Sequence, residues 1–346
     1  MTSRLASLRR RIAAVMGAVV LLSTGLASQT VQINGAAATF PYPIYSKWFS
    51  DYNKLHSNIQ INYQSIGSGG GIRQITNQTV FFGATDGPMT EEQLLAAPGR
   101  ILHLPTVLGA VVPVYNVPGV RTELKFTGQL LADIFLGRVT RWNDAAVSKL
   151  NPGVSLPSTE ITVVHRSDGS GTSYIWVDYL AKVSPDWKKR VGVSTSVNWP
   201  VGVGGKGNEG VAGLVQQTPG AIGYVELIYA LQTHISYGPV QNSAGEFVRA
   251  DVQSVTAAAG AAAAAMPKDF RVSITNAPGK GVYPISSFTW LLLYESPKNT
   301  QMARVMVDFM KWALTEGQKA APDLGYAPLP QTVVKLELDA LSRIKF

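Results

Sequence analysis

The chain has 346 residues, enough for two ordinary domains, and 46% of them are hydrophobic, as expected for a folded protein. It contains no cysteine, which excludes disulfides, thiolate metal sites, a cysteine nucleophile and a lipid-modified cysteine anchor. The formal net charge is +8, but no dense run of lysine and arginine lies outside the N-terminal segment, so nucleic acid is not an expected partner.

The N-terminal segment has the pattern of a secretory signal peptide. Four arginines within the first 11 residues precede an apolar stretch over residues 12–22, which is too short to span a bilayer comfortably. A small-residue cleavage pattern ends at Ala27, so residues 1–27 are predicted to be removed; an uncleaved membrane anchor is the alternative. Without these residues the chain has 26 basic and 22 acidic side chains, and the remaining charge of +4 can draw small anions.

Two strand–loop–helix units follow the signal peptide. Residues 31–33 predict a short strand, and Thr39 is expected to cap a helix that carries its apolar residues on one face. Alternating apolar positions over residues 59–63 predict a second strand, which is followed by a glycine-rich loop around Ser68 and a short helix over residues 72–75. Glycines in such a loop let backbone amides approach a ligand closely, because they carry no Cβ atom.

The middle of the chain predicts two buried strands and the passage to a second lobe. Residues 81–84 are largely apolar and lead to Asp86, which on its own would be interpreted as part of the following turn. Residues 106–117 predict a longer apolar strand that crosses into the second lobe. Helices are predicted over residues 130–136 and from Trp142.

The best candidate for a ligand site is the polar stretch Arg166-Ser167-Asp168-Gly169-Ser170-Gly171-Thr172. An apolar strand over residues 161–164 leads into it, and an amphipathic helix through residues 175–183 follows it. Its hydroxyls and glycine amides therefore lie at the positive end of a helix dipole, where an anion is favoured. The guanidinium adds a planar set of donors that suits a tetrahedral oxyanion. The alternative is an ordinary polar turn in which Ser170 or Thr172 caps the helix.

The C-terminal half continues the alternation of strands and helices. A glycine loop over residues 200–208 satisfies G-x-G-x-x-G, but it lacks a convincing strand before it and a ribose-binding acid after it, so a dinucleotide site is not expected. The alanine-rich residues 257–265 predict a surface helix or loop without an assigned function. Further predicted elements are helices over residues 209–217, over 300–314 and from Pro330, and strands over residues 221–225 and 287–294. This order predicts the α/β class with mostly parallel sheets.

The sequence offers no catalytic motif. Its four histidines are scattered without metal-ligand spacing, and no G-x-S-x-G nucleophile elbow is found. His165 precedes Arg166, but neighbouring side chains of a strand point to opposite faces, so His165 is expected away from the site. A triad built on Ser170 and Asp168 would need a distant histidine that nothing identifies. We therefore expect no catalytic residue, no metal and no cofactor.

Seven stretches of the chain resemble motifs of the substrate-binding proteins of bacterial phosphate ABC importers, and they extend along nearly the whole chain after residue 27. They are Gly35-Ala-Ala-Ala-Thr-Phe-Pro41, Tyr63-Gln-Ser-Ile-Gly-Ser-Gly-Gly70, Phe82-Gly-Ala-Thr-Asp86, Val139-Thr-Arg-Trp142, Arg166-Ser-Asp-Gly-Ser-Gly-Thr-Ser173, Gly204-Gly-Lys-Gly-Asn208 and Gly220-Ala-Ile-Gly-Tyr-Val-Glu226. The departures are small: Gly69 stands where the motif has a second serine, Phe81 where an acid can occur, and His165 where a basic residue is frequent.

The resemblance implies a two-lobed fold, similar to type II periplasmic binding proteins, that closes like a hinged trap on one anion. One lobe would comprise residues 28–106 and 284–346 and the other residues 107–283, each with a mostly parallel sheet flanked by helices, joined by a two-strand hinge. The implied function is high-affinity binding of inorganic phosphate and its delivery to the permease subunits and the ATPase of an importer. The protein would be a monomer in the periplasm and not an enzyme.

The resemblance also implies which residues hold the phosphate. The expected ligand-binding residues are Thr39, Phe40 through its backbone amide, Ser68, Asp86, Arg166, Ser170, Gly171 and Thr172, with Asp168 supporting the guanidinium. Asp86 would accept the proton that phosphate keeps near neutral pH, whereas sulfate has no such proton and would meet a like charge. The alternatives are a receptor for sulfate, molybdate or tungstate, a phosphatase with Ser170 as nucleophile, and a surface adhesion or scavenger protein of the same fold.

Overall fold

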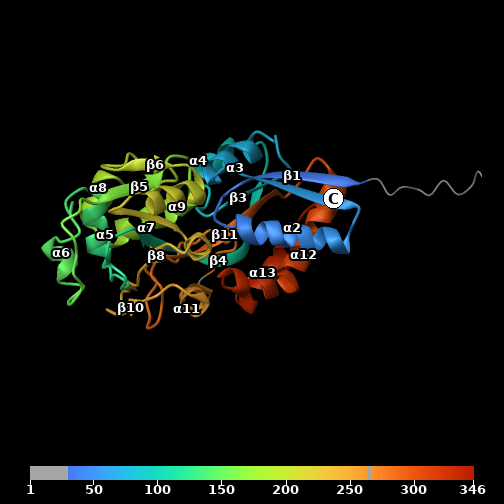
Figure 1. Cartoon of the computed structure of the whole chain (residues 1–346). Helices are drawn as coiled ribbons and strands as arrows, with labels where there is room; N and C mark the ends of the chain where they lie inside the picture. Colours follow the sequence, from blue (N-terminus) through green and yellow to red (C-terminus); the bar gives the residue numbers. More distant parts are fainter. Residues whose placement is uncertain (1–29, 264–265) are drawn as a thin grey trace, which may run out of the picture.

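The computed structural model describes residues 30–263 and 266–346, and the predicted signal peptide lies outside the described residues (Figure 1). The strands are β1 (Val31–Ala37), β2 (Ile59–Ser65), β3 (Phe82–Thr85), β4 (Ile101–Tyr115), β5 (Thr162–Arg166), β6 (Val203–Gly205), β7 (Ala221–Glu226), β8 (Ser236–Tyr237), β9 (Val240–Gln241), β10 (Phe247–Val248) and β11 (Ser286–Tyr294). The helices are α2 (Tyr42–Leu55), α3 (Ser68–Thr76), α4 (Glu91–Ala96), α5 (Gly128–Phe135), α6 (Ala145–Ser148), α7 (Gly171–Val183), α8 (Pro185–Arg190), α9 (Gly207–Gln217), α10 (Leu227–Thr233), α11 (Val252–Ala263), α12 (Thr300–Thr315) and α13 (Gln331–Leu341), with 3-10 turns η2 (Gly317–Ala320) and η3 (Pro322–Leu324).

Most of the strands belong to one sheet with the order β2-β1-β3-β11-β4-β7-β5-β6, and β8 also pairs with β4. The outer pairs β1/β2, β1/β3, β5/β6 and β5/β7 are parallel, as the alternation of strands and helices predicts. The pairs that involve β4 or β11 are antiparallel, so the centre of the sheet departs from the predicted parallel arrangement. The α/β class is confirmed, and the fold is two-lobed.

Strand β4 connects the two halves of the molecule. Its residues 101–110 pair with β11, and its residues 111–115 pair with β7. Figure 1 shows the early and late parts of the chain, with α2, α12 and α13, at one end, and the middle of the chain, with α5, α6 and α8, at the other. A register shift opposite Thr289 and Trp290 leaves Thr106 as an extra residue in β4.

Helix α2 shows why the apolar periodicity of the sequence produces these elements. Ile44, Trp48 and Tyr52 recur about one turn apart and are all buried in the core, where Tyr52 contacts Phe309 and Trp312 of α12. Burying one such side chain stabilises the fold by roughly 1.5–3 kcal/mol. The indole of Trp48 also donates a hydrogen bond of 2.7 Å to the carbonyl of Gly317, which ties α2 to the C-terminal part of the chain.

Four local predictions differ from the structure. Helix α2 starts at Tyr42 with Pro41 before it, so Thr39 is not the cap. Helix α3 already begins at Ser68, because Gly67 adopts φ 85 and redirects the backbone before it. The glycine loop contains the short strand β6, which pairs with β5. The alanine-rich segment, predicted as a surface helix or loop, belongs to α11; Gly260 is exposed, but Ala258 and Ala259 are buried where the helix packs on β4 and β11, and residues 264–265 lie outside the described residues.

Candidate anion-binding site

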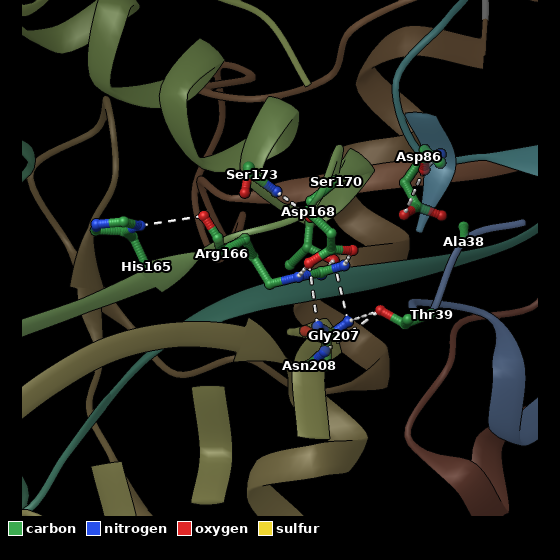
Figure 2. A network of polar contacts seen from close by, with 12 residues as sticks. Ala38, Thr39, Asp86, His165, Arg166, Asp168, Ser170, Ser173, Gly207 and Asn208 are labelled. Atoms are coloured by element: carbon green, nitrogen blue, oxygen red, sulfur yellow. Dashed lines mark hydrogen bonds and ion pairs between the residues drawn. The ribbon is translucent and has the colours of Figure 1, made fainter. Parts of the chain in front are cut away.

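The predicted ligand-binding residues lie together, where loops from the two ends of the sheet meet (Figure 2). Ser68 at the start of α3 and Asp86 after β3 face the start of α7, and a Cβ atom added at Gly171 would lie 2.4 Å from Ser68 Oγ and 2.5 Å from Asp86 Oδ2. Thr39 and Thr172 lie close together, since the side-chain amide of Asn208 donates to both of their hydroxyls. All of these residues are buried. A backbone hydrogen bond also joins the start of α3 to the loop before α7, since Gly69 N–H donates to the carbonyl of Gly169 at 2.9 Å.

Arg166 is the positive charge of the site. It ends β5, its exposed fraction is 3%, and its backbone N–H donates to the hydroxyl of Tyr224 at 3.1 Å. Its Nε and Nη2 atoms donate to the two carboxylate oxygens of Asp168 at 2.7 and 2.5 Å, so the guanidinium plane is fixed. Burial would raise the pKa of Asp168, but the hydrogen bonds and charge of Arg166 outweigh it and lower that pKa. Asp168 is therefore a carboxylate at neutral pH.

Asp86 is a second acidic group of the site and, unlike Asp168, forms no ion pair with Arg166 (Figure 2). Its exposed fraction is 1%, and Thr289 donates its hydroxyl to Asp86 Oδ1 at 2.8 Å. Burial raises the pKa of Asp86 to about 7, although the Thr289 hydrogen bond, the charge of Arg166 and the Ser68 hydroxyl oppose that rise. The group can therefore hold or release a proton near neutral pH.

Backbone amides add donors of fixed direction. Within the described residues, the N–H groups of Phe40, Ser68, Gly171 and Thr172 donate to no protein atom. Three of them are first or second residues of α3 or α7, where helix amides are unpaired and the helix dipole favours an anion. Ser170 caps α7, and its Oγ accepts from the N–H of Ser173 at 3.0 Å. Of the two caps considered for this helix, Ser170 is the one observed.

Two further polar residues join the site that the sequence reasoning did not assign. Asn208, at the start of α9, donates its amide to the hydroxyls of Thr39 and Thr172. Thr289 of β11 reaches Asp86 from the bulged part of the sheet, next to Thr106. Asn208 ends a stretch that carries the family resemblance and so had a signal, whereas Thr289 lies within an apolar strand and is distinguished by its tertiary contact alone.

The histidine nearest to the central stretch does not face the ligand-binding residues. His165 is half-buried and stacks on Trp199 with ring centroids 4.8 Å apart, as expected for the opposite face of β5. Burial lowers the pKa of His165. Within the described residues, no group of three or more His, Asp or Glu side chains is placed to hold a metal ion.

Comparisons with known proteins identify the class to which this fold and this site belong. A family model described as a PBP superfamily domain matches residues 24–316. The solved structure of a high-affinity periplasmic phosphate-binding protein, PfluDING, with bound phosphate, matches with a TM-score of 0.71 at 22% identity, over 90% of this chain and 93% of that one. At this identity the likeness concerns the fold, and the fold is that of the PBP superfamily.

Two relatives of known family show to which family of this superfamily the chain belongs. The phosphate-binding protein PstS of Xylella fastidiosa (strain Temecula1) is 50% identical over 309 residues, which cover 89% of this chain and 84% of the relative. The phosphate-binding protein PstS of Pasteurella multocida is 45% identical over 323 residues, which cover 93% of each chain. The chain therefore belongs to the family of PstS phosphate-binding proteins. No helix among the described residues is both long and apolar enough to cross a bilayer.

Proposed function

We propose that this chain binds inorganic phosphate between its two lobes with high affinity and delivers it to an ABC importer. The observation that carries this proposal is a buried site in which many hydrogen-bond donors surround one carboxyl group that can gain or lose a proton near neutral pH. Arg166, four backbone amides and several hydroxyls favour an oxyanion, and Asp86 suits the proton that phosphate retains. The relatives are named as phosphate-binding proteins, which agrees with this chemistry.

Each site residue then has a distinct task. Thr39, the Phe40 amide and Ser68 donate from one lobe, and Arg166, Ser170, Gly171 and Thr172 donate from the other. Asp168 keeps the guanidinium in its plane, since it holds Nε and Nη2, whereas Nη1 faces Thr172 Oγ1 at 3.4 Å. Because Asp168 also neutralises Arg166, the anion is stabilised mainly by dipoles rather than by an excess of buried positive charge.

The proposed lobes comprise residues 28–106 with 284–346 and residues 107–283. The change of partner along β4, from β11 at Ala110 to β7 at Val111, supports a crossing between the lobes within this strand, a few residues after the proposed boundary. Donors from both lobes would then favour the closed form when phosphate binds. The proposed partners are the permease subunits and the ATPase of the importer, and the proposed location is the periplasm after removal of residues 1–27.

Titration calorimetry of the purified protein with phosphate, sulfate and molybdate tests this function. At pH 8, where Asp86 is mostly ionised, we expect tight binding of phosphate and no measurable binding of sulfate. Tight binding of sulfate or molybdate with weak phosphate binding would favour the receptor for another oxyanion. Steady release of phosphate from a phosphate monoester would favour the phosphatase. Among the described residues, Ser170 Oγ accepts from the N–H of Ser173 and donates to no base that could activate it as a nucleophile.

A further inference from the structure

The amide side chain of Asn208 has a fixed orientation at the centre of the site. Its exposed fraction is 0%, and its Oδ1 atom accepts a hydrogen bond of 2.9 Å from the backbone N–H of Glu226. A backbone N–H can only donate, so the atom it meets must be the amide oxygen. The NH₂ group therefore points the other way, and it donates to Thr39 Oγ1 at 2.7 Å and to Thr172 Oγ1 at 3.1 Å.

Both threonine hydroxyls have their acceptor capacity filled. Thr39 Oγ1 also accepts from the backbone N–H of Asn208 at 3.4 Å, and Thr172 Oγ1 also accepts from Arg166 Nη1 at 3.4 Å. A hydroxyl oxygen has two lone pairs and one hydrogen, so each hydrogen must be donated elsewhere. Neither hydroxyl donates to any acceptor in the part of the chain that the structure describes.

We propose that Asn208 is a positioning residue that turns the hydroxyls of Thr39 and Thr172 into obligatory donors toward the bound anion. This inference rests on the proposed function and adds a rule of specificity to it. Ligand oxygens next to these two hydroxyls must be unprotonated acceptors, which leaves the proton of a phosphate to Asp86. Because Thr39 and Asn208 belong to different proposed lobes, the hydroxyl of Thr39 acquires this direction when the lobes meet.

A purely structural role of Asn208 makes a different prediction. The bond from Glu226 N–H to Oδ1 secures the start of α10, and an aspartate at position 208 would keep both that acceptor and the size of the side chain. Asn208→Asp replaces the NH₂ group with an acceptor oxygen, toward which the two threonine hydroxyls would turn their hydrogens. Asn208→Ala instead releases the hydroxyls, which can still rotate toward the ligand.

The test compares phosphate affinity and thermal stability of Asn208→Asp, Asn208→Ala and the wild type, with Asn116→Ala as control. Asn116 also contacts α9, through a bond of 2.9 Å from Nδ2 to the carbonyl of Gln216, and this bond involves none of the proposed ligand-binding residues. We expect phosphate affinity to fall about tenfold for Asn208→Ala and about a hundredfold or more for Asn208→Asp, and to stay unchanged for the control. Because aspartate also adds a negative charge beside the anion and so weakens binding by itself, the decisive result is whether the effect of Asn208→Ala depends on the hydroxyl of Thr39.

A double-mutant cycle with Thr39→Val keeps the inference testable if Asn208→Asp does not fold. Valine has the shape of threonine without the hydroxyl, so Asn208→Ala should weaken phosphate binding much less in the Thr39→Val background. Wild-type affinity in both Asn208 variants, or equal losses in both with no coupling to Thr39, would overturn the inference and leave the proposed function intact. Absence of phosphate binding by the wild-type protein would instead refute the proposed function itself.

Discussion

Replacing Asp86 with asparagine should weaken phosphate binding and allow sulfate to bind. Thr289 donates to Asp86 Oδ1, so the amide oxygen of Asp86→Asn will remain with Thr289. The NH₂ group then takes the place of Oδ2, next to Ser68 and Gly171, and a donor replaces the acceptor of the phosphate proton. The loss of a hydrogen bond with a charged partner should weaken phosphate binding by about 1.5–3 kcal/mol, while sulfate loses a repulsion and gains a donor.

The protonation of Asp86 also makes the stability of the folded protein depend on pH. The pKa of Asp86 rises from 3.8 to about 7, and this rise corresponds to roughly 4 kcal/mol by which the ionised carboxylate destabilises the ligand-free folded protein. The folded protein loses stability as pH rises from 3.8 to 7, because the unfolded chain releases the proton of Asp86 at a lower pH than the folded chain does. Asp86→Asn lacks this loss, so it should have a higher Tm than the wild type at pH 8.

Competition of sulfate against labelled phosphate, in both proteins and at one ionic strength, measures the effect. In the wild type, sulfate binding should strengthen by up to about tenfold per pH unit as pH falls toward 7, because protonated Asp86 can donate to sulfate. In Asp86→Asn, sulfate binding should be measurable and insensitive to pH over the same range. If sulfate is rejected equally by both proteins at every pH, Asp86 does not select the ligand and serves the turn that follows it.

Three further predictions test the site and the fold. Arg166→Ala should weaken phosphate binding by about 1.5–3 kcal/mol in titration calorimetry, and Asp168→Asn should weaken it less; equal affinities of Arg166→Ala and the wild type would remove Arg166 from the site. Gly171→Ala should weaken phosphate binding at least about tenfold, because its Cβ meets the opposite loops, whereas Gly213→Ala, whose Cβ meets open space, should bind normally; normal binding by both would show that the loops need not approach so closely. Burial raises the pKa of Glu337 well above its usual range, and neither of its carboxylate oxygens has a partner among the described residues, so stability is lost as pH rises above about 4.5. Calorimetric scans should therefore show a higher Tm for Glu337→Gln than for the wild type at pH 8 and a similar Tm at pH 4, and a lower Tm at pH 8 would contradict this interpretation.

The apolar periodicity of the sequence predicts the positions of most strands and helices. The strands around residues 31–33, 59–63 and 287–294 were predicted because burial imposes a local pattern, and the structure places strands there. The antiparallel centre of the sheet was not predicted, because pairing between β4 and β11 depends on residues far apart in the chain. The start of α2 was misplaced because Thr39 is held by Asn208, a partner 169 positions away, instead of by its own helix.

The site illustrates the same division between local and distant information. The loop from Arg166 to Thr172 carries its own signals, since the Arg-x-Asp spacing places both side chains for a paired contact and Ser170 caps the next helix. The raised pKa of Asp86 depends on burial by several segments, so no local pattern could show it. The roles of Asn208 and Thr289 likewise follow from tertiary hydrogen bonds.

The position of β11 in the sheet governs the order in which the chain can fold. β11 lies between β3 and β4, although residues 116–285 separate it from β4 in the sequence. A chain that emerges with its N-terminus first therefore cannot complete the sheet of the first proposed lobe until β11, residues 286–294, is available. Until then β3 and β4 have exposed edges, and closure of this long loop slows their pairing. Strands β5, β6 and β7 pair with one another and with β4 without β11, so we expect this part of the sheet to form first and to hold β4 in place for β11.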